Sequence, residues 1–125
     1  MNVAVIGASN DPEKYSYQAV RLLKEKGHTV FPVHSTLLEI EGMKVYSSIK
    51  DIQSPVDTVS LYIAMEVSTR LAEDIFSKKP RRIIFNPGAE NHDLEFKAAA
   101  KGIKTLNACT LVMLRTNQFE QDRVL

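Results

Sequence analysis

The chain alternates short, mainly apolar runs with amphipathic stretches. Residues 3–6, 29–33, 58–63 and 82–86 form four such runs, and residues 103–106 form a shorter fifth. Apolar residues occupy successive positions in the longer runs, which is typical of strands buried on both faces of a parallel sheet. Each run therefore predicts a strand. Pro32 places the second strand near an edge, because proline removes one donor from the ladder.

Helical spacing of apolar residues follows three of these strands. The residues at this spacing are Ala19, Val20, Leu22 and Leu23, then Val67, Leu71 and Ile75, and finally Leu94, Ala98 and Ala99. The three predicted helices end at Gly27, Pro80 and Gly102. Residues 37–57 are irregular, and Ser47 or Ser48 is expected to cap one helical turn there. A short closing helix is predicted over residues 111–114.

Repeated strand–helix alternation predicts the α/β class, as a Rossmann-like doubly wound parallel sheet of about five strands. Helices would cover both faces, giving a single three-layer α/β/α domain. A chain of 125 residues suits one domain of this kind. We assign the domain to residues 1–116. Residues 117–125 show little periodicity beyond Phe119. They are predicted to form a C-terminal tail that is either frayed or docked on a partner, and a frayed tail is favoured.

Composition narrows the classes of partner and the compartment. There are 16 basic and 15 acidic residues, so charge favours neither a nucleic-acid nor a membrane partner. The chain has one cysteine, Cys109, which excludes an internal disulfide framework and fits a reducing compartment. The N-terminus does not resemble a signal peptide, and no apolar run approaches a membrane span of ~20 residues. We therefore expect a cytoplasmic protein. The basic run over residues 78–82 is expected to be a solvated turn.

The ligand crevice of a parallel α/β sheet lies outside the carboxyl ends of its strands. Five loops should meet at this edge, and they contain Gly7-Ala8-Ser9, His34-Ser35, Ala64-Met65, Asn86-Pro87-Gly88 and Asn107-Ala108-Cys109. The first of these follows a buried strand and precedes a helix, where backbone N–H groups can bind a phosphate. The three histidines are scattered, without metal-ligand spacing, and no metal site is predicted.

The first loop departs from the common phosphate-binding motifs. The dinucleotide fingerprint needs two further glycines after Gly7 and an acid at the end of the second strand, where this chain has His34. NAD is therefore disfavoured, and the P-loop spacing is also absent. A flavin stays open. The loop still offers Gly7, Ser9, Lys14 and Ser16, and an ammonium, hydroxyls and a helix N-terminus can together satisfy a pyrophosphate.

Several segments, taken in order, resemble the CoA-binding domain family, whose best-known member is the N-terminal domain of the succinyl-CoA synthetase α subunit. They are residues 5–9, 14–16, 31–33, 42–46, 86–89 and 107–109. The resemblance extends to about Leu114. It implies that coenzyme A or a short acyl-CoA lies across the carboxyl edge of the sheet. The family often has proline after the second and third strands, where this chain has Ser35 and Met65.

The resemblance also implies a role for individual residues. Gly7, Ala8, Ser9, Lys14 and Ser16 would hold the phosphates, Val33 and His34 would line the adenosine region, and Ile63 and Ala64 would meet the pantetheine. The thiol end would lie toward Asn86, Gly88 and Cys109. No residue is assigned a catalytic role.

The family's ligase chemistry needs parts beyond this domain. Succinyl-CoA synthetase uses a phosphorylated histidine from a second domain and a nucleotide-binding partner subunit, and this chain ends where that second domain would begin. We therefore expect non-catalytic binding of CoA. The alternatives are a small enzyme that acts on a CoA thioester or disulfide through Cys109, or an NAD- or flavin-binding protein. Cys109 precedes an apolar run, so a buried, inert thiol is the favoured interpretation. A protein partner or a homodimer stays open.

Overall fold

The computed structural model describes residues 1–122. Its elements in chain order are β1 (Asn2–Ile6), α1 (Tyr15–Glu25), β2 (Thr29–Val33), β3 (Glu39–Ile40), β4 (Met43–Lys44), η1 (Ile49–Asp51), β5 (Thr58–Leu61), α2 (Met65–Ser77), β6 (Arg82–Phe85), α3 (His92–Ala100), β7 (Lys104–Asn107) and α4 (Thr110–Arg115). The predicted strands and helices are all present, with ends that differ by a few residues.

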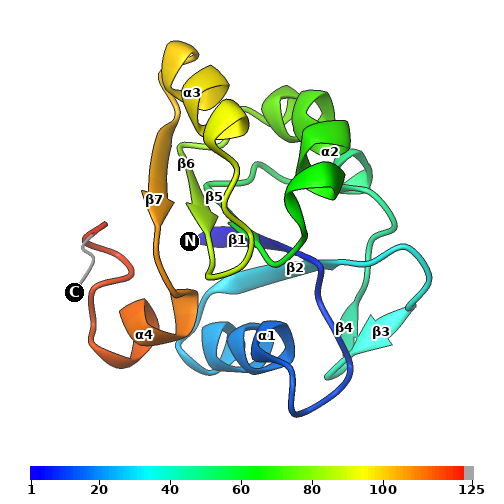
Figure 1. Cartoon of the computed structure of the whole chain (residues 1–125). Helices are drawn as coiled ribbons and strands as arrows, with labels where there is room; N and C mark the ends of the chain where they lie inside the picture. Colours follow the sequence, from blue (N-terminus) through cyan, green and yellow to red (C-terminus); the bar gives the residue numbers. More distant parts are fainter. Residues whose placement is uncertain (123–125) are drawn as a thin grey trace.

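Five strands form one parallel sheet in the order β2-β1-β5-β6-β7. Helices α2 and α3 cover one face of the sheet, and α1 and α4 cover the other (Figure 1). The α/β Rossmann-like fold predicted from the sequence is confirmed. Strand β2 lies at an edge, so the missing N–H of Pro32 costs the sheet little.

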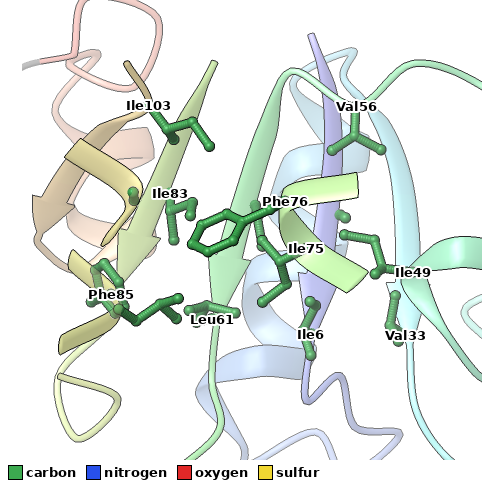
Figure 2. Close-up of a cluster of buried hydrophobic side chains, with 14 of the residues drawn as sticks. Ile6, Val33, Ile49, Val56, Leu61, Ile75, Phe76, Ile83, Phe85 and Ile103 are labelled. Atoms are coloured by element: carbon green, nitrogen blue, oxygen red, sulfur yellow. The ribbon is translucent and has the colours of Figure 1, made fainter. Parts of the chain in front are cut away.

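Each face of the sheet packs its own apolar core. The first core lies under α2 and α3 and includes Ile6, Leu61, Ile75, Ile83 and Phe85, all nearly or fully buried (Figure 2). The second lies under α1 and α4 and includes Val5, Val20, Leu23, Ile84 and Met113. Because both faces are covered, the strands carry apolar residues at successive positions.

The irregular segment after β2 forms a small antiparallel hairpin, β3–β4, followed by the helical turn η1. The hydroxyl of Ser48 accepts a hydrogen bond from the Lys50 N–H at 3.2 Å, which confirms the predicted cap. Tyr46 exchanges backbone hydrogen bonds with Pro32 and His34 and so ties this segment to the edge of the sheet.

The C-terminal segment differs from the prediction. Phe119 is 2% exposed and packs in the second core, and its carbonyl accepts a hydrogen bond from Arg82 at 2.6 Å. The frayed-tail prediction was therefore wrong for residues 117–122, and residues 123–125 lie outside the described part. The buried ring of Phe119 and the ion pair of Arg82 with Asp122 anchor the segment. Arg82 is itself fully buried, so the prediction of a solvated turn was wrong at that residue.

Among the described residues, no helix is long and apolar enough to cross a membrane.

Candidate functional site

A cleft lies at the carboxyl edge of the sheet, where the strand order reverses. From β1 the chain moves to β2 on one side and later to β5 on the other, so the loops after these strands diverge around β1. A topological switch point of this kind is where α/β sheets bind ligands. The cleft measures about 670 Å³, within the usual range of small-molecule sites.

Gly7 lines the cleft. Its φ is +89°, and a Cβ atom added there would lie 2.6 Å from the carbonyl oxygen of Tyr62. Only glycine combines this backbone conformation with so close an approach to the end of β5. The N–H groups of Gly7 and Ala8 both donate to the carbonyl of Val33, at 3.1 and 3.2 Å. These hydrogen bonds attach the first loop to β2, and the close approach to Tyr62 packs it against the end of β5.

The rest of the first loop is held by its own polar groups. The Ser9 hydroxyl accepts from the Asp11 N–H at 3.0 Å, and the Asp11 carboxylate accepts from the Glu13 N–H at 3.0 Å. The carbonyl of Asp11 accepts from the Lys14 N–H. These turns deliver the chain to the first residue of α1 in a defined conformation, with Lys14 and Ser16 among the lining residues of the cleft.

The N-terminus of α1 lies at this cleft, and no acidic side chain in its first turn offsets the positive end of the helix dipole. Lys14 occupies the N-cap position, makes no side-chain capping hydrogen bond, and is followed by a first turn with no acidic residue. By contrast, α3 is capped by Asn91 and has Asp93 in its first turn. A cation at a helix N-terminus is unfavourable by several tenths of a kcal/mol. The arrangement becomes favourable when a bound anion contacts both the Lys14 ammonium and the N-terminus of α1.

His34 lines the cleft at the end of β2. Its Nδ1 atom accepts hydrogen bonds from the backbone N–H groups of Thr36 and Leu37, at 3.1 and 3.0 Å. Because Nδ1 is an acceptor, the ring hydrogen lies on Nε2. The half-buried imidazole therefore turns the chain after β2 and also provides a donor group at the cleft.

The opposite wall of the cleft is mainly apolar and comes from α2 and from the residues between β5 and α2. Tyr62, Ile63, Val67 and Leu71 form it. Burial, followed by the proximity of Cys109, raises the pKa of the Tyr62 hydroxyl. Sequence reasoning identified only Ile63 here. Val67 and Leu71 carried the same periodic signal as core residues, and Tyr62 lay within an apolar run.

The structure brings together most of the predicted residues. The cleft is lined by Gly7, Ala8, Ser9, Lys14, Ser16, Val33, His34 and Ile63, together with Tyr15, Ser35 and Ser47, to which the sequence analysis assigned no ligand role. Tyr15 is 67% exposed at the mouth, and no periodic signal distinguished it from a surface residue. Four predicted residues lie outside this lining: Ala64, Asn86, Gly88 and Cys109.

Asn86 has a role inside the protein. It is 1% exposed, and its amide donates to the Ser60 hydroxyl and the Leu61 carbonyl, both at 2.9 Å. Its side-chain oxygen accepts from the Thr110 N–H at 2.8 Å. Asn86 therefore joins the ends of β5 and β6 to the start of α4.

Cys109 immediately precedes α4 and is partly exposed. The sequence favoured a buried thiol, and the structure corrects this. The apolar run that follows Cys109 packs through Leu111, Met113 and Leu114, while the cysteine itself stays at the edge of the sheet.

The fold and the cleft define a Rossmann-like α/β domain with a ligand site at the switch point of its sheet. The chain belongs to the CoA-binding domain family, whose defining pattern matches residues 1–115.

Individual relatives agree with this assignment. Over 62 residues, 49% of this chain, it is 44% identical to the alpha subunit of the ADP-forming acetate–CoA ligase II of Pyrococcus furiosus, and the match covers 14% of that protein. It is 32% identical over 72 residues to the uncharacterized protein YneT of Bacillus subtilis, covering 58% of this chain and 53% of YneT. The chain thus spans only part of the length of these relatives.

A crystal structure of an uncharacterized protein matches nearly the whole fold. Its TM-score is 0.89 at 36% sequence identity, and the match covers 94% of this chain and 97% of the other. The fold is thus found elsewhere as a chain of similar length.

Proposed function

We propose that the cleft binds coenzyme A or a short acyl-CoA non-covalently. The observation that carries this proposal is the unfilled positive end of α1, where Lys14 and an uncapped helix N-terminus meet in the cleft. The backbone N–H groups of a first helical turn have no partners within their own helix. A diphosphate supplies both the acceptors and the negative charge that this arrangement requires.

The remaining surface of the cleft suits the other parts of the same ligand. The hydroxyls of Ser35 and Ser47 and the imidazole of His34 lie at the β2 side, and the apolar wall of Ile63 and Leu71 lies at the β5 side. A nucleotide with a long, largely apolar arm matches a cleft with one polar and one apolar side. Membership of the CoA-binding domain family supports the same ligand.

We propose binding without catalysis. The groups that line the cleft are suited to holding a ligand: an ammonium, hydroxyls, backbone N–H groups and apolar side chains. The one imidazole in the lining uses Nδ1 to organise its own loop. The domain would then act as a carrier or sensor of CoA in the cytoplasm, alone, with a protein partner or as a homodimer.

Isothermal titration calorimetry with CoA and acetyl-CoA tests the proposal, beside thermal-shift measurements with NAD, NADP and FMN. We expect saturable binding of CoA and a rise in melting temperature with CoA concentration, because a ligand that binds only the folded state stabilises it. NAD, NADP and FMN should give smaller shifts. A larger shift with any of these three, or no heat with CoA at high micromolar concentration, would contradict the proposal.

The competing function is chemistry at Cys109, and the partial exposure of this thiol is the observation that favours it. Labelling of the folded protein with a thiol reagent at neutral pH separates the two. Under the binding proposal, Cys109 should react no faster than a free thiol of ordinary acidity, with or without CoA. Reaction well above that rate, with protection by CoA, would favour an enzyme that acts on a CoA thioester or disulfide.

A further inference from the structure

Few cationic groups line the cleft, although CoA is a strongly anionic ligand. CoA carries a diphosphate and, in addition, a phosphate on its ribose. Among residues 1–122, the only lysine or arginine that lines the cleft is Lys14. Together with the N-terminus of α1, worth about half an elementary charge, Lys14 roughly matches the two charges of a diphosphate. Among the described residues, no further cation of the lining is then left to pair with the phosphate on the ribose.

Among the described residues, no lysine, arginine, aspartate or glutamate lines the β2 side of the cleft. At this place a Rossmann-type site contacts the ribose, through an acid for a free hydroxyl or a nearby arginine for a phosphate. The chain has His34, Ser35 and Ser47 there instead. A carboxylate would repel a ribose phosphate, and a guanidinium would select it. This set of side chains contains neither group, so it should neither repel nor select a ribose phosphate.

The hydrogen bonds of His34 keep its ring in one form. The backbone N–H groups of Thr36 and Leu37 donate to Nδ1 from 3.1 and 3.0 Å, so this atom is occupied as an acceptor. In the neutral ring the hydrogen therefore lies on Nε2. Within the described chain no protein acceptor is paired with Nε2, and the ring borders the cleft.

We propose that His34 donates from Nε2 to a ribose oxygen of the ligand and that the site does not select the 3′-phosphate of CoA. This inference rests on the proposed function and deepens it. The ligand class becomes pantetheine nucleotides with or without a ribose phosphate, and dephospho-CoA binds about as tightly as CoA.

Calorimetry with CoA and dephospho-CoA, on the whole chain in one buffer, is the direct test. We expect the two dissociation constants to agree within about threefold. A cation on the 3′-phosphate would favour CoA by roughly tenfold or more, since charge-assisted hydrogen bonds are the strong ones. A preference of that size for CoA would overturn this inference and leave the proposed function standing. Failure of both ligands to bind would overturn both.

Two variants locate the contacts. His34→Asn keeps a side-chain oxygen that can accept the backbone N–H groups of its turn. Its amide nitrogen lies nearer the backbone than Nε2, so the donor at the position of Nε2 is lost. It should weaken both ligands by a similar factor, roughly two- to tenfold, as expected for one neutral hydrogen bond. Lys14→Ala should also weaken both alike. Selective loss of CoA in either variant would show that the residue contacts the 3′-phosphate and would overturn the inference.

Thr36→Val is the matched control for His34→Asn. It removes the long 3.4 Å contact between the Thr36 hydroxyl and His34 Nδ1 but keeps the backbone N–H that His34 accepts. We expect it to bind both ligands as the parent protein does. The tautomer can be determined independently from the ¹⁵N chemical shifts of the His34 ring. Hydrogen on Nδ1 in the free protein would overturn the inference, whatever the affinities.

Discussion

The two edges of the central sheet treat charge in opposite ways. At the amino edge, the fully buried guanidinium of Arg82 donates to the Thr58 hydroxyl, the Phe119 carbonyl and the carboxylate of Asp122, and it stacks on the Phe119 ring at 4.3 Å. At the carboxyl edge, α1 begins with an uncapped turn beside Lys14. Within the described residues, the amino edge supplies the counter-charge for its buried cation, whereas the carboxyl edge supplies none for Lys14.

This difference separates stability from ligand binding. A buried charge with its partners in place specifies the docking of the C-terminal segment, and removal of one partner leaves the other uncompensated. An exposed cation at a helix N-terminus gives up a little stability and gains a place for an anion. Local rules of this kind are commonly broken at functional sites. Changes at the amino edge should therefore affect folding, and charge changes at the carboxyl edge should affect binding.

The largest expected effect is that of Gly7→Val. It tests whether the carboxyl edge, which should tolerate changes of charge without loss of stability, also tolerates a change that strains its backbone. The new Cβ would lie 2.6 Å from a backbone oxygen, and φ is +89°. We expect a loss of about 4 kcal/mol in unfolding free energy, measured by urea denaturation, because strain and overlap add. CoA binding should be lost as well.

Gly27→Val is the matched control for this change. Gly27 has nearly the same φ, +87°, and a Cβ there would meet no atom within 4 Å. It should cost only about 1–2 kcal/mol, the strain of the left-handed conformation. Equal losses at the two positions would show that the close approach of Gly7 to β5 contributes nothing.

The next effect concerns Asp122 at the amino edge. Hydrogen bonds from Arg81, outweighing the effect of burial, hold the pKa of the Asp122 carboxyl below its usual value. A lowered pKa in the folded state means stability that is present above the unfolded value of ~3.9 and is lost as pH falls through the folded pKa. The protein should therefore lose stability below about pH 4.

Asp122→Asn isolates this contribution. We expect a loss of about 2–3 kcal/mol at pH 7, below the full cost of an unpaired buried charge because Arg82 keeps Thr58 and the Phe119 carbonyl, and a flatter loss of stability in acid. Asp93→Asn removes an exposed ion pair with Lys97 on α3 and should change stability by less than about 1 kcal/mol. Urea denaturation from pH 7 to 2.5 gives both quantities. Parallel acid curves for Asp122→Asn and the parent protein would refute the assignment.

The sequence predicted the fold and much of the cleft because both depend on local signals. The apolar run before Gly7 and the helical spacing after Tyr15 are readable without tertiary contacts. Residues such as Tyr62 and Ser47 join the cleft only through strand order and loop placement. Arg82 lay in a basic run, and the acid that neutralises it, Asp122, lies 40 residues away. Long-range pairing of this kind leaves no periodic mark.

The smallest expected effect on folding, and the sharpest test of the contrast between the edges, is that of Lys14→Glu. Lys14 is exposed and makes no capping bond, so stability should change by less than about 0.5 kcal/mol. CoA affinity should fall at least tenfold, because a carboxylate would replace the ammonium beside the diphosphate. Lys26→Glu makes the same change of charge at the other end of α1 and controls for net charge. If both variants bound CoA equally, the phosphates would lie away from α1. The uncompensated charge of Lys14 at the N-terminus of α1 would then need another explanation.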